Sequence, residues 1–256
     1  MKRFALAAVA AAPLAAAFAL MPSTGQEEQG LSRAEIEAVI RDYILANPEV
    51  ILESVGNYQA DEQRTAALIA EEAARRHLPT LISGEAGHAM GASPAEADVV
   101  VVEFFDYHCG FCRRAADYVL GLTGEDGVRV VFQDLPILRE ESRTAALAGL
   151  AAADAGRYEE MHRALMNTAG TLDRDRLKKV ARRAGAGNSV EAALDDRAMR
   201  AQLAGKIELS TEIAADLGIQ GTPAFIVASP DGKRIRLVPG YDPEAVTEAI
   251  ETVRAR

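Results

Sequence analysis

The chain has only two cysteines, Cys109 and Cys112, and they lie three positions apart. A run typical of a buried strand, 99–105, ends just before them, and a helical pattern follows at once. Cys109 is therefore expected at a helix N-terminus, where unpaired backbone N–H groups and the helix dipole stabilise a thiolate. Cys112, one turn further on, is placed to resolve a mixed disulfide formed by Cys109. The spacing predicts a reactive dithiol that needs no cofactor and no metal.

Other uses of the two thiols remain open. A zinc site needs two further ligands, which only four histidines could supply: His77, His88, His108 and His162. A purely structural disulfide would close a loop too short to add much stability. Soft Cu(I) is a third possibility, held by both thiols together with His108.

The composition bounds the class of protein. At about 150 residues per domain, 256 residues form one large domain or two modest ones. A hydrophobic content of 49% with 26% charged residues indicates a folded chain. The formal net charge of −10 argues against nucleic acid or an anionic membrane surface as the main partner.

The N-terminus has the pattern of a secretory signal peptide over residues 1–19. Lys2 and Arg3 precede an uncharged run, and Ala17-Phe18-Ala19 is a small-x-small cleavage site. An uncleaved anchor helix is the alternative, although the run is barely as long as the ~20 residues that span a bilayer. With the signal cleaved, the protein is expected in the oxidising periplasm. Residues 20–30 are expected to form a flexible leader.

Two helices are expected within residues 31–78. Ser32 and Glu35 form a capping-box pattern, and Asn47-Pro48 ends one helix and starts the next. The first helix carries one apolar stripe: Ile36, Val39, Ile40, Tyr43 and Ile44. Such stripes either pack on the following domain or meet those of other copies, and we favour a homo-oligomer formed through 31–78. Residues 79–97 are expected to be a linker, with a possible short edge strand at 88–90.

Residues 98–256 have the pattern of an α/β domain. Four strands are expected, at 99–105, 128–132, 219–227 and 235–238. A helix follows the first strand, and another begins at Pro243. Between the second and third strands, the Ala- and Leu-rich stretch of about 140–217 predicts an all-helical insert of four or five short helices.

These features resemble the thioredoxin fold, and the insert makes the chain similar to DsbA-like thiol-disulfide oxidoreductases. The resemblance rests on the insert and on two segments, Glu-Phe-Phe-Asp-Tyr-His-Cys-Gly-Phe-Cys (103–112) and Gly-Thr-Pro-Ala-Phe (221–225). The helical region 31–78, with its Asn-Pro-Glu-Val element, resembles the oligomerisation region of ScsC and Com-type members. The expected fold is thus a thioredoxin fold with an inserted helical subdomain, preceded by two helices.

The resemblance implies roles for individual residues. Cys109 would be the nucleophile and Cys112 the resolving thiol. Pro223 would be cis and face Cys109, with the backbone of Thr222 pairing with an extended substrate; the alternative is a proline that simply starts a strand.

Two further residues are candidates for the catalytic site. Glu103 would be a buried acid that relays the proton of the resolving thiol, or else a salt-bridged structural residue. His108 would support the thiolate electrostatically, or else point to solvent.

The resemblance also implies a function. Gly-Phe replaces the Pro-His dipeptide of strongly oxidising DsbA proteins, so a less oxidising couple is expected. A threonine precedes the proline, as in DsbC-type isomerases. We therefore expect a periplasmic, oligomeric, isomerase-like enzyme that acts on misoxidised secreted proteins and is reset by a membrane redox partner. The alternatives are a DsbA-type oxidase and a periplasmic copper-binding or metal-tolerance protein.

Overall fold

The computed structural model describes residues 31–255, and the chain divides into two compact units, Met1–Asn57 and Tyr58–Arg256. The expected signal peptide and leader lie outside the described residues. The first unit contains α1 (Arg33–Ala46) and the beginning of α2 (Glu49–Ser83). The predicted capping box is confirmed, because the Ser32 hydroxyl accepts from the Glu35 N–H and the Glu35 carboxylate accepts from the Ser32 N–H. No residue of α1 is buried.

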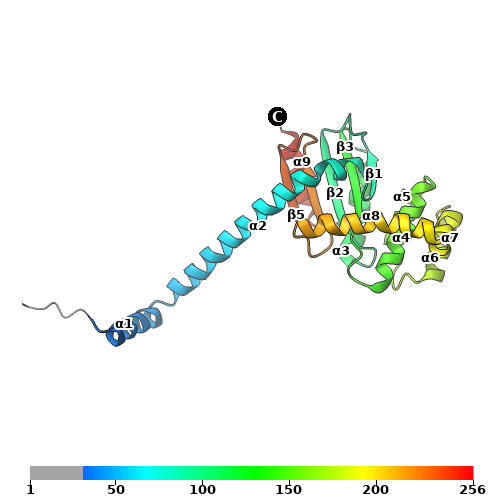
Figure 1. Ribbon diagram of the computed structural model, residues 1–256. Helices are drawn as coiled ribbons and strands as arrows, with labels where there is room; N and C mark the ends of the chain where they lie inside the picture. The colour runs from blue at the N-terminus through cyan, green and yellow to red at the C-terminus, as the bar shows by residue number, and fades with distance from the viewer. Residues whose placement is uncertain (1–30, 256) are drawn as a thin grey trace, which may run out of the picture. The chain divides into compact units, whose positions relative to one another are not determined.

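The second unit is built on one five-stranded sheet with the order β1-β3-β2-β4-β5 (Figure 1). The strands are β1 (His88–Gly91), β2 (Val99–Phe105), β3 (Val128–Asp134), β4 (Ala224–Ala228) and β5 (Ile235–Pro239). β2 and β3 run parallel, with Val99 opposite Val128, and every other pair is antiparallel. β2, at the centre, is completely buried.

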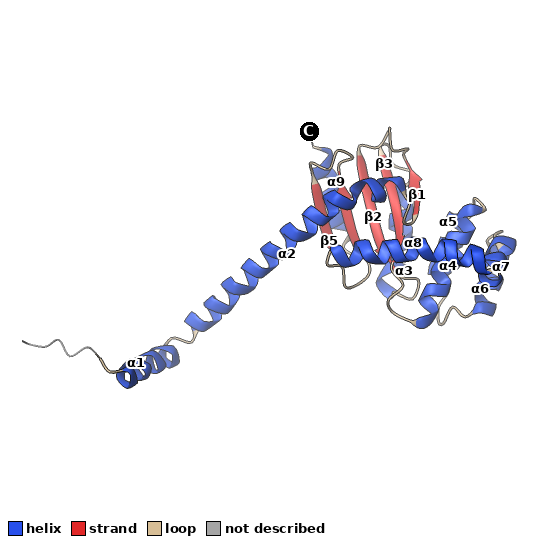
Figure 2. Cartoon of the chain, in the orientation of Figure 1, coloured by secondary structure: helices blue, strands red, loops and turns tan. Residues whose placement is uncertain are grey.

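Helices cover both faces of this sheet (Figure 2). Alternate residues of β2 point to opposite faces, so Val99, Val101 and Phe105 join one apolar cluster and Val100, Val102 and Phe104 the other. The first cluster includes residues of α3 (Gly110–Leu122) and α9 (Pro243–Arg254). The second includes residues of α8 (Arg197–Asp216) and of the C-terminal part of α2.

The helical insert lies between β3 and β4, as expected. Its helices are α4 (Glu140–Asp154), α5 (Tyr158–Met166), α6 (Arg174–Arg183), α7 (Gly187–Asp195) and α8. The small side chains of α4 pack closely, and its apolar residues continue the cluster that includes α3. The expected α/β fold with an inserted helical subdomain is confirmed.

The end of α2 differs from the prediction. A linker was expected from Pro79, but α2 continues through this proline to Ser83. Leu78 and Leu81 are buried against the sheet, and Arg129 donates to the Ile82 carbonyl at 2.7 Å. Burial of this face therefore outweighs the backbone hydrogen bond that the proline cannot donate. The short edge strand expected at 88–90 is confirmed as β1, which pairs with β3.

The third predicted strand also begins later than expected. Residues 219–223 form a loop, and β4 starts at Ala224. The apolar character of Ile219 suggested a strand, but this side chain instead packs against the cluster that includes α2 and α8.

Candidate active site

A buried aspartate shapes the turn between β2 and α3. Asp106 accepts hydrogen bonds from the N–H groups of His108 at 2.8 Å and Leu138 at 2.9 Å. Its carbonyl accepts from the Cys109 N–H at 2.9 Å. One residue therefore fixes both the turn before the thiols and the loop that follows β3.

Cys109 is the N-cap residue of α3, and Cys112 lies in its first turn. The Cys112 N–H donates to the Cys109 Sγ at 3.4 Å, and both cysteines are free thiols. A hydrogen bond from the Cys112 thiol, supported by backbone N–H groups of the first turn, lowers the pKa of Cys109 to about 5 against the opposing effect of burial. Burial raises the pKa of Cys112 far above its usual value. At neutral pH, Cys109 is thus a thiolate and Cys112 a protonated thiol.

The loop before β4 brings Thr222 and Pro223 to this thiolate. The Thr222–Pro223 peptide bond is cis, as predicted. The Cys109 Sγ atom lies 3.1 Å from the Thr222 carbonyl oxygen, to which it donates a hydrogen bond when it is protonated. In the part of the chain that the structure describes, the Thr222 N–H has no backbone acceptor. The backbone of Thr222 can therefore pair with an extended chain that lies beside Cys109.

Glu103 is completely buried in β2, on the face that carries Phe105 and the thiols. Neither of its carboxylate oxygens has a hydrogen-bond partner among the described residues, so the salt-bridged alternative finds no support there. Burial, with a smaller effect from the charge of Cys109, raises the pKa of Glu103 to about 8. The Glu103 charge in turn contributes to the raised pKa of Cys112. The Glu103 carboxyl and the Cys112 thiol are therefore electrostatically coupled.

His108 lies elsewhere than expected. Its side chain is 2% exposed, so it does not point to solvent. The Nε2 atom accepts from the Leu172 N–H at 3.2 Å, which leaves the proton of the neutral ring on Nδ1, 2.9 Å from the Ser142 hydroxyl. Burial lowers the pKa of His108. The structure thus ties this ring to the helical insert as a neutral group, which corrects the expectation of a positive charge beside the thiolate.

Exposed apolar side chains lie on the two loops that Asp106 joins, one of which carries the thiols. Within residues 70–255, the exposed large hydrophobic residues are Phe111, Ile137 and Leu138. Phe111 stands between the cysteines, 56% exposed, with the Arg114 guanidinium 4.2 Å from its ring centre. The sequence did not reveal this apolar patch of Phe111, Ile137 and Leu138. The β2–α3 turn and the loop after β3 are far apart in the chain and are joined by the hydrogen bonds of Asp106.

The described residues contain no group of three or more histidine, cysteine, aspartate or glutamate side chains placed to hold a metal ion. Of the residues expected at the site, the structure brings together Cys109, Cys112, Thr222 and Pro223, with Glu103 beneath them. This arrangement is a dithiol on a thioredoxin-like scaffold.

Comparison with known families gives the class a name. The model of the DSBA-like thioredoxin domain matches residues 100–251, and the chain belongs to this family. Its members are thiol-disulfide oxidoreductases. A second model, described as the copper resistance protein ScsC N-terminal domain, matches residues 33–64.

Solved structures of similar proteins agree. A thioredoxin-like oxidoreductase from Silicibacter pomeroyi is 34% identical, with 68% of this chain and 95% of that chain covered and a TM-score of 0.58. Proteus mirabilis ScsC in a transitional conformation is 25% identical, with 88% of this chain and 99% of that chain covered and a TM-score of 0.61. Salmonella enterica Typhimurium BcfH shares the fold, at 22% identity and a TM-score of 0.71, with 87% and 96% covered.

The curated relatives are much longer proteins. The chain is 32% identical over 170 residues to the Na⁺/H⁺ antiporter NhaA 1 of Salinispora arenicola, a match that covers 63% of this chain and 24% of that protein. The chain thus spans about a quarter of the length of the curated relatives it matches. Among residues 31–255, no helix is both long and apolar enough to cross a membrane.

Proposed function

We propose that this oxidoreductase exchanges disulfides in secreted polypeptides of the periplasm, and that it acts as an isomerase in a homo-oligomer. The observation that carries the exchange chemistry is the Cys109 thiolate, which lies at the N-terminus of α3 beside the backbone of Thr222. An exposed apolar patch around it suits unfolded chains better than folded ones.

The exchange begins at Cys109. Its thiolate attacks one sulfur of a substrate disulfide, which forms a mixed disulfide and releases the other substrate sulfur as a thiolate. In isomerisation, that thiolate or another one of the substrate attacks the mixed disulfide, so Cys109 leaves as a thiolate and no net oxidation occurs.

Cys112 resolves a mixed disulfide that the substrate thiols do not attack. The Cys112 thiol must lose its proton before it can attack the Cys109 sulfur. The mixed disulfide removes the Cys109 charge that helps to raise the pKa of Glu103, and the ionised form of this buried carboxyl is the proton acceptor we propose. The attack forms the Cys109–Cys112 disulfide, and the substrate leaves as a thiolate. The substrate disulfide is thereby reduced and the enzyme oxidised, and a membrane redox partner would reverse this change.

The exposed apolar residues of the N-terminal helices support oligomerisation. Thirteen large hydrophobic side chains between Leu31 and Ile69 are exposed, which is unusual for a monomer. On α1, Ile36 and Ile40 lie one turn apart and are 44% and 52% exposed. A second copy of the same stripe would cover them.

Reactivation of scrambled ribonuclease by the full chain tests the isomerase proposal. Removal of residues 22–78 would take Ala73 and Leu78 out of the core, so substitutions on α1 are preferable. Ile36→Glu with Ile40→Glu is expected to give a monomer that has lost most isomerase activity, while Ala38→Glu, on the opposite face, changes neither. Full isomerase activity in a monomer would refute the need for the oligomer, and weak activity of the wild type would instead favour the DsbA-type oxidase.

A copper-binding role is the second candidate, because the model that matches residues 33–64 is described as part of a copper resistance protein. Cys109 and Cys112 are soft ligands suited to Cu(I). Metal analysis of the reduced protein after incubation with Cu(I) tests this role. Copper retained at one ion per chain, and lost in Cys109→Ser, would support it; a substoichiometric content would dismiss it.

A further inference from the structure

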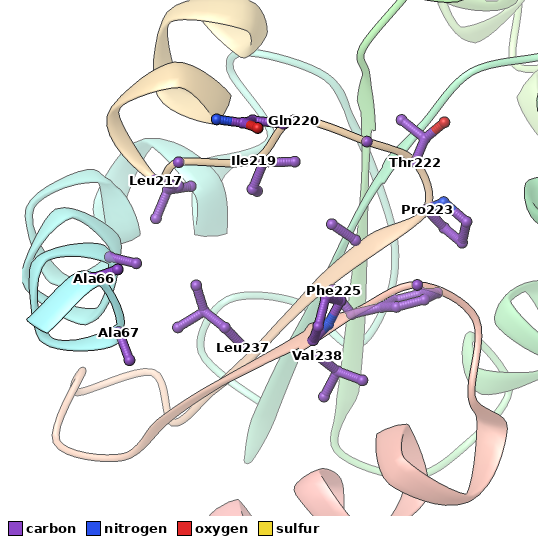
Figure 3. A pocket seen from close by; sticks show the side chains of 16 residues that line it. Ala66, Ala67, Leu217, Ile219, Gln220, Thr222, Pro223, Phe225, Leu237 and Val238 are labelled. Atoms are coloured by element: carbon purple, nitrogen blue, oxygen red, sulfur yellow. The ribbon is translucent and has the colours of Figure 1, made fainter. Parts of the chain in front are cut away.

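A groove runs along the edge of the sheet beside the cis-proline loop (Figure 3). Its volume of about 470 Å³ is within the range of clefts that bind ligands, about 300–1,000 Å³. Three parts of the second unit form it: one turn of α2, the segment from Leu217 to Phe225, and the end of β5.

The lining of this groove is almost entirely apolar. None of its described lining residues is charged, and only Gln220 and Thr222 have polar side chains. Charged residues make up 26% of the chain, so a groove lined without any of them is unusual for this protein. A charged ligand group would lose its hydration here without gaining a partner, whereas an apolar one would gain from burial.

The groove is continuous with the thiol site. Thr222 and Pro223 line it, and the Thr222 carbonyl oxygen lies 3.1 Å from the Cys109 Sγ atom. The Pro223 carbonyl accepts from the Gly240 N–H at 2.9 Å, which ties the proline loop to the end of β5. A chain paired with the backbone of Thr222 would therefore have its neighbouring residues at the mouth of the groove.

The wall opposite the sheet comes from the N-terminal helical region. Ala66 and Ala67 of α2 face Leu217, Ile219 and Leu237 across the groove (Figure 3). These alanines leave open a space that larger side chains would fill.

The next turns of α2 hold Ala66 and Ala67 in place through their contacts with the rest of the second unit. Ala73 and Ala74 are buried against the sheet, and Arg75 donates to the Gly232 carbonyl in the β4–β5 turn. The His77 Nε2 atom lies 2.9 Å from the Asp216 carboxylate at the end of α8.

We propose that this groove binds apolar, uncharged residues that flank the reacting cysteine of the substrate, and that Ala66 and Ala67 of α2 determine which side chains fit. The inference rests on the proposed exchange at Cys109 and adds to it a substrate class, extended apolar segments. It also gives α2 a role in specificity that is separate from oligomerisation.

Two symmetric peptide disulfides test this proposal with the reduced full-length protein. In one peptide the cysteine is flanked by leucines, and in the other by aspartates; glutathione disulfide serves as a reference without apolar flanks. Each reaction oxidises the Cys109–Cys112 pair and reduces one substrate disulfide to two thiols, so stopped-flow rates are directly comparable. The leucine peptide is expected to react at least about tenfold faster than the aspartate peptide, the effect of burying one leucine side chain.

Substitutions then locate the preference. Ala67→Trp, which fills the groove, is expected to lower the ratio of the leucine-peptide rate to the glutathione rate about tenfold. Thr65→Trp, exposed on the other side of α2, should leave this ratio unchanged. Gln220→Lys, at an exposed position on the opposite wall, introduces a charge without disturbing the core and should shift the preference toward the aspartate peptide.

The outcomes separate the two proposals. No reaction with any of the three disulfides would refute the exchange function itself. Reaction with glutathione disulfide but equal rates for both peptides would overturn the groove proposal alone. A leucine preference that persists in Ala67→Trp and in Gln220→Lys would overturn it equally.

Discussion

Replacement of the buried acid, Glu103→Gln, gives a quantitative test of the electrostatics beneath the thiols. Burial raises the pKa of Glu103 from 4.5 to about 8, so the folded protein keeps a proton that the unfolded chain loses between these two values. Folding stability therefore falls as the pH rises through this window. At pH 7 the penalty is about 3 kcal/mol, compared with about 1 kcal/mol at pH 5.

Glutamine is a neutral substitute of the same shape and has no such penalty. Urea unfolding of the reduced wild type and of Glu103→Gln, at pH 5 and at pH 7, gives the difference in stability between them at each pH. This difference should shift by about 2 kcal/mol in favour of the variant as the pH rises. Other titrating groups cancel because both proteins contain them.

Oxidation of the dithiol supplies a control for the same experiment. Part of the raised pKa of Glu103 comes from the charge on Cys109, and the disulfide form has no such charge. The shift between pH 5 and pH 7 should therefore be smaller in the oxidised proteins. A stability difference that is the same at both pH values in the reduced proteins would refute the argument, because Glu103 would then ionise as it does in the unfolded chain.

Three further predictions concern the thiols and the core. The ultraviolet absorbance of the Cys109 thiolate should titrate with a midpoint near pH 5. Cys112→Ala should raise this midpoint, because it removes the hydrogen bond that stabilises the thiolate most. A midpoint above pH 8 in the wild type would contradict the geometry. The reduction potential, measured against glutathione, should be more negative than the roughly −120 mV of DsbA, and an equal value would refute the inference from the Gly-Phe dipeptide. Gly149→Ala would place a Cβ atom 2.5 Å from the Tyr107 hydroxyl and should destabilise the protein by about 1–3 kcal/mol. Gly205→Ala, on an open helix surface, should stabilise it by about 1 kcal/mol. Thermal or urea unfolding of both variants checks this, and equal effects would show that the core around Gly149 adjusts to the added methyl group without cost.

Local patterns predicted much of the fold and site. The uninterrupted run from Val99 to Phe105 indicated a strand buried on both faces, and the following C-x-x-C placed Cys109 at a helix start. Both features depend on residues adjacent in the chain, as does the capping box at Ser32. The cis geometry of Thr222–Pro223 was instead implied by the resemblance to DsbA-like proteins, because a proline in a sequence does not reveal its isomer.

Features that depend on distant contacts were not predictable in this way. Pro79 suggested a helix end, but the burial of Leu78 and Leu81 on a sheet formed later in the chain keeps the helix intact. His108 suggested a positive charge near the thiolate, but its partners, Ser142 and Leu172, lie in the insert. The groove likewise unites α2 with β5, which lie far apart in the chain.

The most direct test of the central claim is to trap the covalent intermediate. Reduced Cys112→Ala protein, mixed with scrambled ribonuclease and quenched with acid, is analysed by mass spectrometry. If Cys109 is the nucleophile, a mixed disulfide through Cys109 accumulates because no second thiol can resolve it, while Cys109→Ala protein forms no comparable adduct. An adduct of equal yield through Cys112 in Cys109→Ala, or none in either variant, would contradict the account.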